Sequence, residues 1–371
     1  MEGGGTYPRP VASGHLAYLD GARVMVVPFN IKEPVVDPGA IPPDTGIRAT
    51  SFAVADDATL VYAEPDANVA GGRRSLVWVD GDGKETEIPA EPRSYQYPQV
   101  SPDGRRVAVA VLSAPSDIWL MDVATSAMTR LTFEPSTEAA PVWAPDGTRI
   151  VFASNRDNGF NLWWQPADGT GRAERLTDGQ YAKFPTSITP DGRHAIYWET
   201  TPEGGRDLNM VSLDGTKRVT PVLKTPAAEL FAALSPDRRW LAYESDSSGQ
   251  RDVFVRPFPD VDRGIWQISN GGGRQPVWSR DGAELFYFAA DGAVVSVRVS
   301  TQRSAFGTAP AQRVLGANYY GVSTPALVAR TYDVVPGARR FIAIKAPEER
   351  DTAGRPDIVL VQHWGCTLTN W

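Results

Sequence analysis

Apolar residues of this chain fall into short runs, separated by turns that combine Pro, Asp and Gly. A representative stretch is Pro141-Val-Trp-Ala-Pro-Asp-Gly-Thr-Arg-Ile-Val-Phe-Ala-Ser-Asn155. Proline presets φ in such a turn, aspartate bonds its own backbone, and glycine accepts positive φ. The stretch therefore predicts an antiparallel hairpin with a tight turn between two buried strands.

The same hairpin recurs along the chain at a regular interval. The turn aspartates are Asp57, Asp103, Asp146, Asp191, Asp237 and Asp281, which are separated by 46, 43, 45, 46 and 44 residues. This interval is typical of a four-stranded propeller blade. Extending the frame reaches Ser13 near one end and Pro336 near the other, which raises the number of repeats to eight.

The repeats predict an all-β fold, a single β-propeller of four-stranded antiparallel blades over residues 1–371. We expect eight blades, with seven as the alternative, near residues 5–46, 47–92, 93–136, 137–180, 181–226, 227–272, 273–318 and 327–364, followed by a tail at 365–371. Closing the ring removes exposed sheet edges, so the strand at Asp357–His363 should lie near the N-terminal strands Leu16–Phe29. A pair of β-sandwiches is the alternative fold. It would not require hairpins at a constant spacing along the chain, so the regular spacing favours the propeller.

Each repeat carries a large apolar residue two positions before the turn proline, as at Trp143 and Trp278. We interpret this position as a contact between neighbouring blades. The third strand often opens with Asn or Asp, as at Asn161, Asp207 and Asp252, whose short side chains fasten the preceding loop.

Charge and composition exclude several classes of protein. The formal charge is −7, with 37 basic against 44 acidic residues and no basic run, which argues against nucleic-acid binding. The single cysteine, Cys366, supports neither a disulfide framework nor a thiolate zinc site. No apolar run reaches the length of a membrane span, so we expect no membrane insertion by this chain, and residues 1–5 lack the features of a secretory signal. The compartment is therefore left open.

Several motifs resemble those of a known family. The hairpin of residues 141–154, together with Asp117-Ile-Trp119 and Glu174-Arg-Leu-Thr177, resembles the repeats of PD40 or TolB-like β-propellers. The resemblance extends from Gly14 to Trp364. The segments Gly14–Tyr18, Val26–Phe29, Arg251–Pro259 and Asp281–Tyr287 are most similar to the propeller region of bacterial transmembrane serine/threonine kinases.

The resemblance implies a propeller that belongs to a larger bacterial protein and lies outside the cytoplasm or in the periplasm. The chain itself has no kinase signature, because it lacks a glycine-rich loop with its lysine and a His-Arg-Asp loop. Its last residues, Val361–Trp371, depart from the Leu-Asn-Trp-Phe ending of those relatives. This departure and the abrupt Met1 lead us to expect a fragment with altered termini.

Ring geometry predicts a ligand- or partner-binding site at one mouth of the central channel. Residues at the start of each innermost strand, seven positions before the turn proline or one residue later, should converge there. Arginines among them would hold a carboxylate or phosphate of a small anionic ligand or a protein segment, whereas a hydrated ring of neutralised charges would hold nothing. The predicted mouth residues are Tyr95, Gln96, Glu138, Lys183, Glu229, Arg274 and Arg330.

A metal site and an enzyme active site are the alternatives. No cofactor is expected, but Glu138, Glu229 and Asp333 are the candidates for a divalent cation such as calcium, against which Lys183 argues. The chain has no GxSxG elbow, so no catalytic residue can be assigned. We therefore expect a non-catalytic sensor or scaffold that binds a protein segment or an anionic ligand. The alternative is a hydrolase of phosphotriesters, esters or lactones that acts in the channel.

Overall fold

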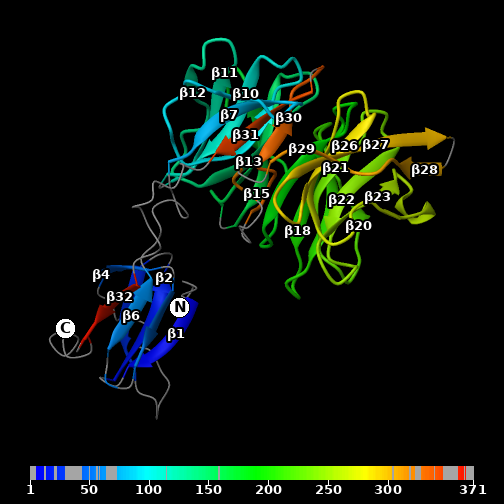
Figure 1. The fold of residues 1–371 in the computed structure, drawn as a ribbon. Coiled ribbons are helices and arrows are strands. Elements are labelled where there is room, and N and C mark those ends of the chain that lie inside the picture. Colours follow the sequence, from blue (N-terminus) through cyan, green and yellow to red (C-terminus); the bar gives the residue numbers. More distant parts are fainter. Residues whose placement is uncertain are drawn as a thin grey trace. The chain divides into compact units, whose positions relative to one another are not determined.

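A computed structural model of the chain shows antiparallel sheets and almost no helix (Figure 1). The structure describes residues 6–11, 14–20, 23–29, 44–49, 51–63 apart from 56 and 58, 73–345 apart from 114, 158, 303–304, 317–318, 322–326 and 338, and 358–364 apart from 363. The only helical segment among these residues is the 3-10 turn η1 (Val261–Arg263). The predicted all-β class is confirmed.

The chain forms two compact units, which requires a correction to the prediction of one eight-bladed ring. One unit is Arg73–Pro347, and the other combines Met1–Gly72 with Glu348–Trp371. Each unit buries a core of its own. In the smaller unit, Leu19, Val26, Leu60 and Trp364 belong to one apolar cluster.

The smaller unit contains two sheets. The first has the order β1-β2-β3-β4, and the second has the order β32-β6-β5. Their strands are β1 (Thr6–Val11), β2 (His15–Asp20), β3 (Arg23–Pro28), β4 (Asp44–Arg48), β5 (Ser51–Val54), β6 (Leu60–Ala63) and β32 (Ile358–Val361).

The larger unit contains six sheets of at least four strands. Five of them follow the chain order predicted for a blade, with the first strand of each repeat at one edge of its sheet. Their strands are β9 (Tyr95–Val100), β10 (Arg106–Val111), β11 (Asp117–Asp122) and β12 (Met128–Arg130); β13 (Glu138–Trp143), β14 (Arg149–Ser154), β15 (Asn161–Pro166) and β16 (Glu174–Arg175); β17 (Lys183–Ile188), β18 (His194–Thr200), β19 (Arg206–Ser212) and β20 (Val219–Leu223); β21 (Glu229–Leu234), β22 (Trp240–Ser245), β23 (Asp252–Pro257) and β24 (Trp266–Gln267); β25 (Gly273–Trp278), β26 (Glu284–Ala289), β27 (Val294–Gln302), β28 (Ala305–Thr308) and β29 (Gln312–Leu315).

The sixth sheet joins the two ends of the larger unit. Its order is β30-β31-β7-β8, with β30 (Tyr332–Val334), β31 (Arg340–Lys345), β7 (Ser75–Asp80) and β8 (Glu85–Glu87). Figure 1 shows β30 and β31, from the C-terminal part, beside β7. Strand β31 pairs with β7 along its whole length, from Arg340 opposite Asp80 to Lys345 opposite Ser75.

As predicted, the C-terminal strand lies near the N-terminal strands, since Val361 packs against the cluster that contains Leu19 and Val26. The strand pairing differs from that of successive blades in one ring. The repeat at 47–92 is divided, since β5 and β6 pair with β32 while β7 and β8 pair with β31. Strand β32 lies along β6 in the smaller unit instead of joining β2 and β3. The third strands of all repeats present the same backbone hydrogen-bonding groups, and a second strand can pair with any of them. The repeat pattern therefore does not specify which strands pair.

The innermost strands of the six sheets contact one another in the cyclic order β30, β9, β13, β17, β21, β25 and back to β30. Tryptophans two residues before the turn join successive sheets, as predicted for this position. The indole Nε1 of Trp143 donates to the Gln99 carbonyl at 3.0 Å, and that of Trp278 donates to the Ala233 carbonyl at 3.0 Å. Each acceptor lies on the innermost strand of the preceding sheet.

The turns adopt the predicted geometry. Gly104 and Gly147 have φ of 72° and 70°, and the Gly104 amide donates to the Ser101 carbonyl at 2.9 Å. The Asp103 carboxylate accepts from the Ser101 hydroxyl at 2.6 Å and from the Arg105 amide at 3.0 Å. These turns gather at one end of the innermost strands and form the rim of the site described next.

Candidate functional site

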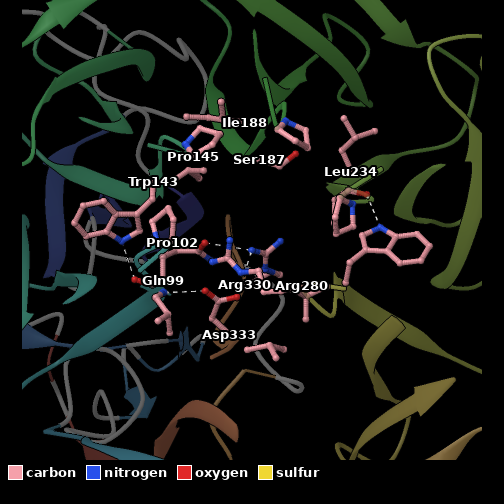
Figure 2. A pocket seen from close by; sticks show the side chains of 18 of the residues that line it. Gln99, Pro102, Trp143, Pro145, Ser187, Ile188, Leu234, Arg280, Arg330 and Asp333 are labelled. Carbon is pink, nitrogen blue, oxygen red and sulfur yellow. Dashed lines mark hydrogen bonds and ion pairs between the residues drawn. The ribbon is translucent and has the colours of Figure 1, made fainter. Parts of the chain in front are cut away.

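A cavity of about 280 Å³ lies where the innermost strands of all six sheets end at their turns (Figure 2). Every sheet of the larger unit contributes to the wall. The lining residues include Gln99, Pro102, Trp143, Pro145, Ser187, Pro190, Pro236, Trp278, Arg280, Arg330 and Asp333.

The upper wall of the cavity is apolar and rigid. Four of the turn prolines, Pro102, Pro145, Pro190 and Pro236, line it together with Trp143 and Trp278. Proline has a fixed φ and little side-chain entropy to lose, so this wall is preorganised for contact with another molecule.

The floor of the cavity carries a buried charged group. Arg330 and Asp333 are 8% and 6% exposed, and an Arg330 Nη2 donates to Gln99 Oε1 at 3.2 Å. The same nitrogen lies 3.8 Å from Asp333 Oδ1, whereas Asp333 Oδ2 accepts from the Val100 amide at 2.8 Å. Figure 2 shows Arg330 at the centre of the ring of lining residues. The Arg330 Nε has no hydrogen-bond partner among the described residues.

Arg280 replaces proline in one of the turns that line the cavity. It occupies the proline position of the turn Ser279-Arg280-Asp281-Gly282, and its exposed side chain lines the cavity. The lining thus contains two guanidinium groups and one carboxylate, although the chain as a whole has a charge of −7. Local charge therefore favours an anionic ligand.

Ser187 adds an unsatisfied hydroxyl to the wall. It follows the bulge in β17, and its Oγ has no hydrogen-bond partner among the described residues. A buried polar atom without a protein partner is uncommon, so this hydroxyl can bond to a molecule that enters the cavity.

The structure brings only one of the predicted mouth residues, Arg330, into this cavity, together with the metal candidate Asp333. The other predicted residues lie toward the opposite ends of the innermost strands. Tyr95 is buried and its hydroxyl donates to the Glu91 carbonyl at 2.6 Å, while Gln96 Nε2 donates to the Tyr320 hydroxyl at 3.2 Å.

Glu138 and Lys183 are engaged within their own sheets. Both are almost fully buried, and Glu138 Oε1 accepts from Ser154 Oγ at 2.7 Å and from Arg156 Nη2 at 3.1 Å. Lys183 Nζ forms an ion pair with Glu199 at 3.0 Å. In each case the partner lies on or directly after the second strand of the same sheet.

Glu229 is a buried carboxylic acid. Its side chain accepts a hydrogen bond from the Thr225 hydroxyl, while its Oε2 has no partner among the described residues. Burial raises the pKa of Glu229 to about 7, and the nearby charge of Asp207 acts in the same direction. At neutral pH the group therefore lies near its titration midpoint.

Arg274 lies next to a second buried acid, Glu244. The Glu244 carboxylate accepts from Arg251 Nη1 at 2.6 Å and from the Gln275 amide at 3.2 Å. Burial raises the pKa of Glu244, against the opposing charges of Arg251 and Arg274.

The described residues contain no group of three or more His, Cys, Asp and Glu side chains with the geometry of a metal site. Glu138, Glu229 and Asp333 thus do not form such a group, although they were the cation candidates. Also within the described residues, no helix has the length and apolarity to cross a bilayer.

Sequence reasoning missed Gln99, Ser187 and Arg280. For Arg280 a signal was present, since arginine replaces the proline that four other turns carry. Gln99 and Ser187 both lie three residues before the turn proline, a position that no sequence feature singles out. The strands of Gln99 and Ser187 each contain a bulge, which changes the alternation of side chains along the strand.

Comparisons with known proteins agree with this fold. Residues 79–223 match the family described as the PD40, TolB beta propeller domain. An uncharacterized protein of Agrobacterium fabrum is 28% identical over 201 residues, which cover 51% of this chain and 67% of that protein.

The Tol-Pal system protein TolB of Francisella tularensis is 29% identical over 216 residues. The match covers 43% of this chain and 47% of TolB, so the chain spans about half the length of that relative. A solved structure from Agrobacterium tumefaciens, assigned as a TolB, aligns with a TM-score of 0.56 at 14% identity. That alignment covers 74% of this chain and 98% of the solved chain, and it shows likeness of fold alone. In its matched repeats, its TolB relatives and its fold, this chain is therefore similar to the PD40, TolB-like β-propellers.

Proposed function

We propose that the chain is a non-catalytic binding module, in which the cavity at the turn end of the channel holds a segment of a partner protein. The observation that carries this proposal is the lining of the cavity by all six sheets. Its walls are prolines and tryptophans on a hydrogen-bonded scaffold, so binding would require little reorganisation of the protein. The buried Arg330 and the unsatisfied Ser187 hydroxyl supply the directional contacts.

The experiment selects peptides from a random displayed library on the purified protein and measures their affinities. We expect enriched peptides that lose at least roughly 10-fold in affinity for the variant Ser187→Trp, in which an indole occupies part of the cavity. The matched control is Phe133→Ser, because Phe133 is exposed and does not line the cavity. Equal binding to both variants, or no enrichment at all, would contradict the proposal.

We further propose that the module is the extracytoplasmic sensor part of a larger bacterial protein. Support comes from the resemblance of segments such as Arg251–Pro259 to the propeller region of transmembrane kinases. Fractionation of the source cells with a specific antibody tests this placement. Recovery of the protein in the cytosol alone would contradict it.

Hydrolysis in the channel stays a hypothesis of a different class. The described lining residues include neither His nor Cys, and Asp333 is the single carboxylate among them. Turnover of a panel of phosphotriesters, esters and lactones, abolished by a chelator and restored by a divalent cation, would replace the binding proposal.

A further inference from the structure

We propose that the cavity recognises the C-terminal carboxylate of an extended peptide chain, through Arg330 at its floor and Arg280 at its rim. The inference rests on the proposed function, because it assigns the chemistry of the segment that the cavity would hold. It follows from four features of the cavity: its excess of donors, the position of Arg280, the state of the rim carboxylates, and its depth.

Donors exceed acceptors at the floor of the cavity. A guanidinium offers five N–H donors, and Arg330 has one hydrogen bond, to Gln99, within the described residues. Asp333 lies beyond hydrogen-bond distance from it at 3.8 Å, and its other oxygen already accepts from the Val100 amide. Because Arg330 is only 8% exposed, its remaining N–H donors need a hydrogen-bond acceptor inside the cavity.

Arg280 adds a second guanidinium to the cavity lining. In this turn arginine replaces proline, and the side chain forms no hydrogen bond or ion pair with any residue that the structure describes. Figure 2 shows Arg280 and Arg330 close together in the view into the cavity. Two guanidinium groups suit a carboxylate, which has about four lone-pair positions.

Carboxylates at the rim do not compete for these arginines. Asp103 and Asp281 accept hydrogen bonds from Ser101 and Ser279, each at 2.6 Å, and from the Arg105 and Ala283 amides of their own turns. The serine hydroxyls hold the pKa of both carboxyls below the usual value. Each rim carboxylate is therefore satisfied within its own turn.

The depth of the cavity favours a chain end over an internal acidic side chain. Gln99, the partner of Arg330, precedes the rim residue Pro102 by three positions, which corresponds to roughly 10 Å along the strand. A glutamate side chain extends only about 5 Å from its backbone, so an internal acid would have to bring two chain strands past the prolines. A C-terminal segment enters as one strand and packs its apolar atoms on Trp143 and Trp278.

The test compares pools of N-acetylated tetrapeptides that lack Trp and Tyr. One pool ends in a free carboxylate, a second ends in an amide, and a third ends in an amide but carries an internal Glu. Binding is followed through the fluorescence of the protein, since Trp143 and Trp278 line the cavity. We expect the free-acid pool to bind at least roughly 10-fold more tightly than either amide pool.

Three variants localise the effect. Arg280→Pro restores the residue of the other turns and should weaken the free-acid pool at least roughly 5-fold, and Arg330→Gln should abolish its advantage over the amide pool. Arg105→Gln is the control, because it removes the same charge from an exposed turn residue that does not line the cavity. We expect it to bind all pools as the wild type does.

Other outcomes separate this inference from the proposed function. Equal binding of the acid and amide pools would overturn the carboxylate assignment and leave a peptide-binding cavity in place. Equal binding of the internal-Glu pool would overturn the role of the chain end. An unchanged preference in Arg280→Pro and Arg330→Gln would overturn the assignment to these arginines. Absence of binding by every pool would count against both proposals.

Discussion

Among the residues that the structure describes, three glutamates are buried in the larger unit, and they differ in whether an arginine neutralises their charge. Glu138, Glu229 and Glu244 are each 1% exposed or less, yet only Glu138 and Glu244 have an arginine within hydrogen-bond distance. Glu229 is bonded to a neutral hydroxyl and keeps one oxygen unpaired among the described residues. It is therefore the group whose ionisation should cost most stability.

The variant Glu229→Gln should remove a pH dependence of stability. In the folded protein the pKa of Glu229 is raised to about 7 by burial, from a usual value of 4.5. The folded state then binds more protons than the unfolded state between these values, so the free energy of unfolding falls as pH rises through this window. The loss should reach about 3 kcal/mol above pH 7. Gln cannot ionise and should lack this loss.

Urea unfolding of both proteins at several pH values measures this difference. The gain from Glu229→Gln should be near zero below pH 4.5 and should grow up to pH 7. The exposed Glu87→Gln serves as the control and should show no such growth. A constant difference between wild type and Glu229→Gln at all pH values would contradict the assignment.

At the scale of elements, the start of strand β25 packs so closely against the loop after β24 that a larger side chain does not fit there. The first positions of the innermost strands hold Tyr95, Glu138, Lys183 and Glu229, but glycine at Gly273. A Cβ at Gly273 would lie 2.2 Å from Ser269 Oγ, and this hydroxyl donates to Asp252 at 2.8 Å and accepts from the Val253 amide. The strand β25 therefore approaches the loop after β24 too closely for any side chain.

Gly273→Ala should destabilise the larger unit by about 1–3 kcal/mol. The added methyl group displaces Ser269 and leaves its buried partners without a hydrogen bond. Gly316→Ala is the control, because no atom lies within 4 Å of its Cβ position. Thermal unfolding should show a lower Tm for Gly273→Ala alone. Equal Tm values for the two variants would show that β25 has room to move.

The whole molecule is organised by the pairing of strands that are distant in sequence. Strands β30 and β31 meet β7 and β8, so residues 73–347 contain both halves of their sixth sheet. Their apolar contacts include Val77, Val79, Phe341 and Ala343 in a single cluster. The smaller unit has a separate core.

A chain of residues 73–347 should therefore fold without the rest. We expect a cooperative thermal transition with a Tm within about 5 °C of the main transition of the full chain, because the core of this unit is complete. The comparison chain of residues 94–347 lacks β7 and β8, so β31 keeps β30 as a partner but loses its partner on the other edge. It should unfold at a much lower temperature or fail to fold. Equal stability of the two chains would contradict the role of the sixth sheet.

Much of this protein was determined by sequence alone, because its main features are local. The turn chemistry of residues such as Pro145, Asp146 and Gly147 specifies a hairpin within a few residues, and its repetition specifies four-stranded sheets. The tryptophan contacts at Trp143 and Trp278 followed from the same pattern. These features depend on interactions between residues close in the chain or at equivalent positions in neighbouring repeats.

Tertiary structure alone decided which ends pair and which side chains line the cavity. Any second strand of a repeat can pair with any third strand, so the division of residues 47–92 between two units has no local signal. Contacts between strands gave Glu138 and Lys183 partners in their own sheets and placed Arg330 in the cavity lining. Both outcomes depend on long-range packing, which a repeat pattern does not encode.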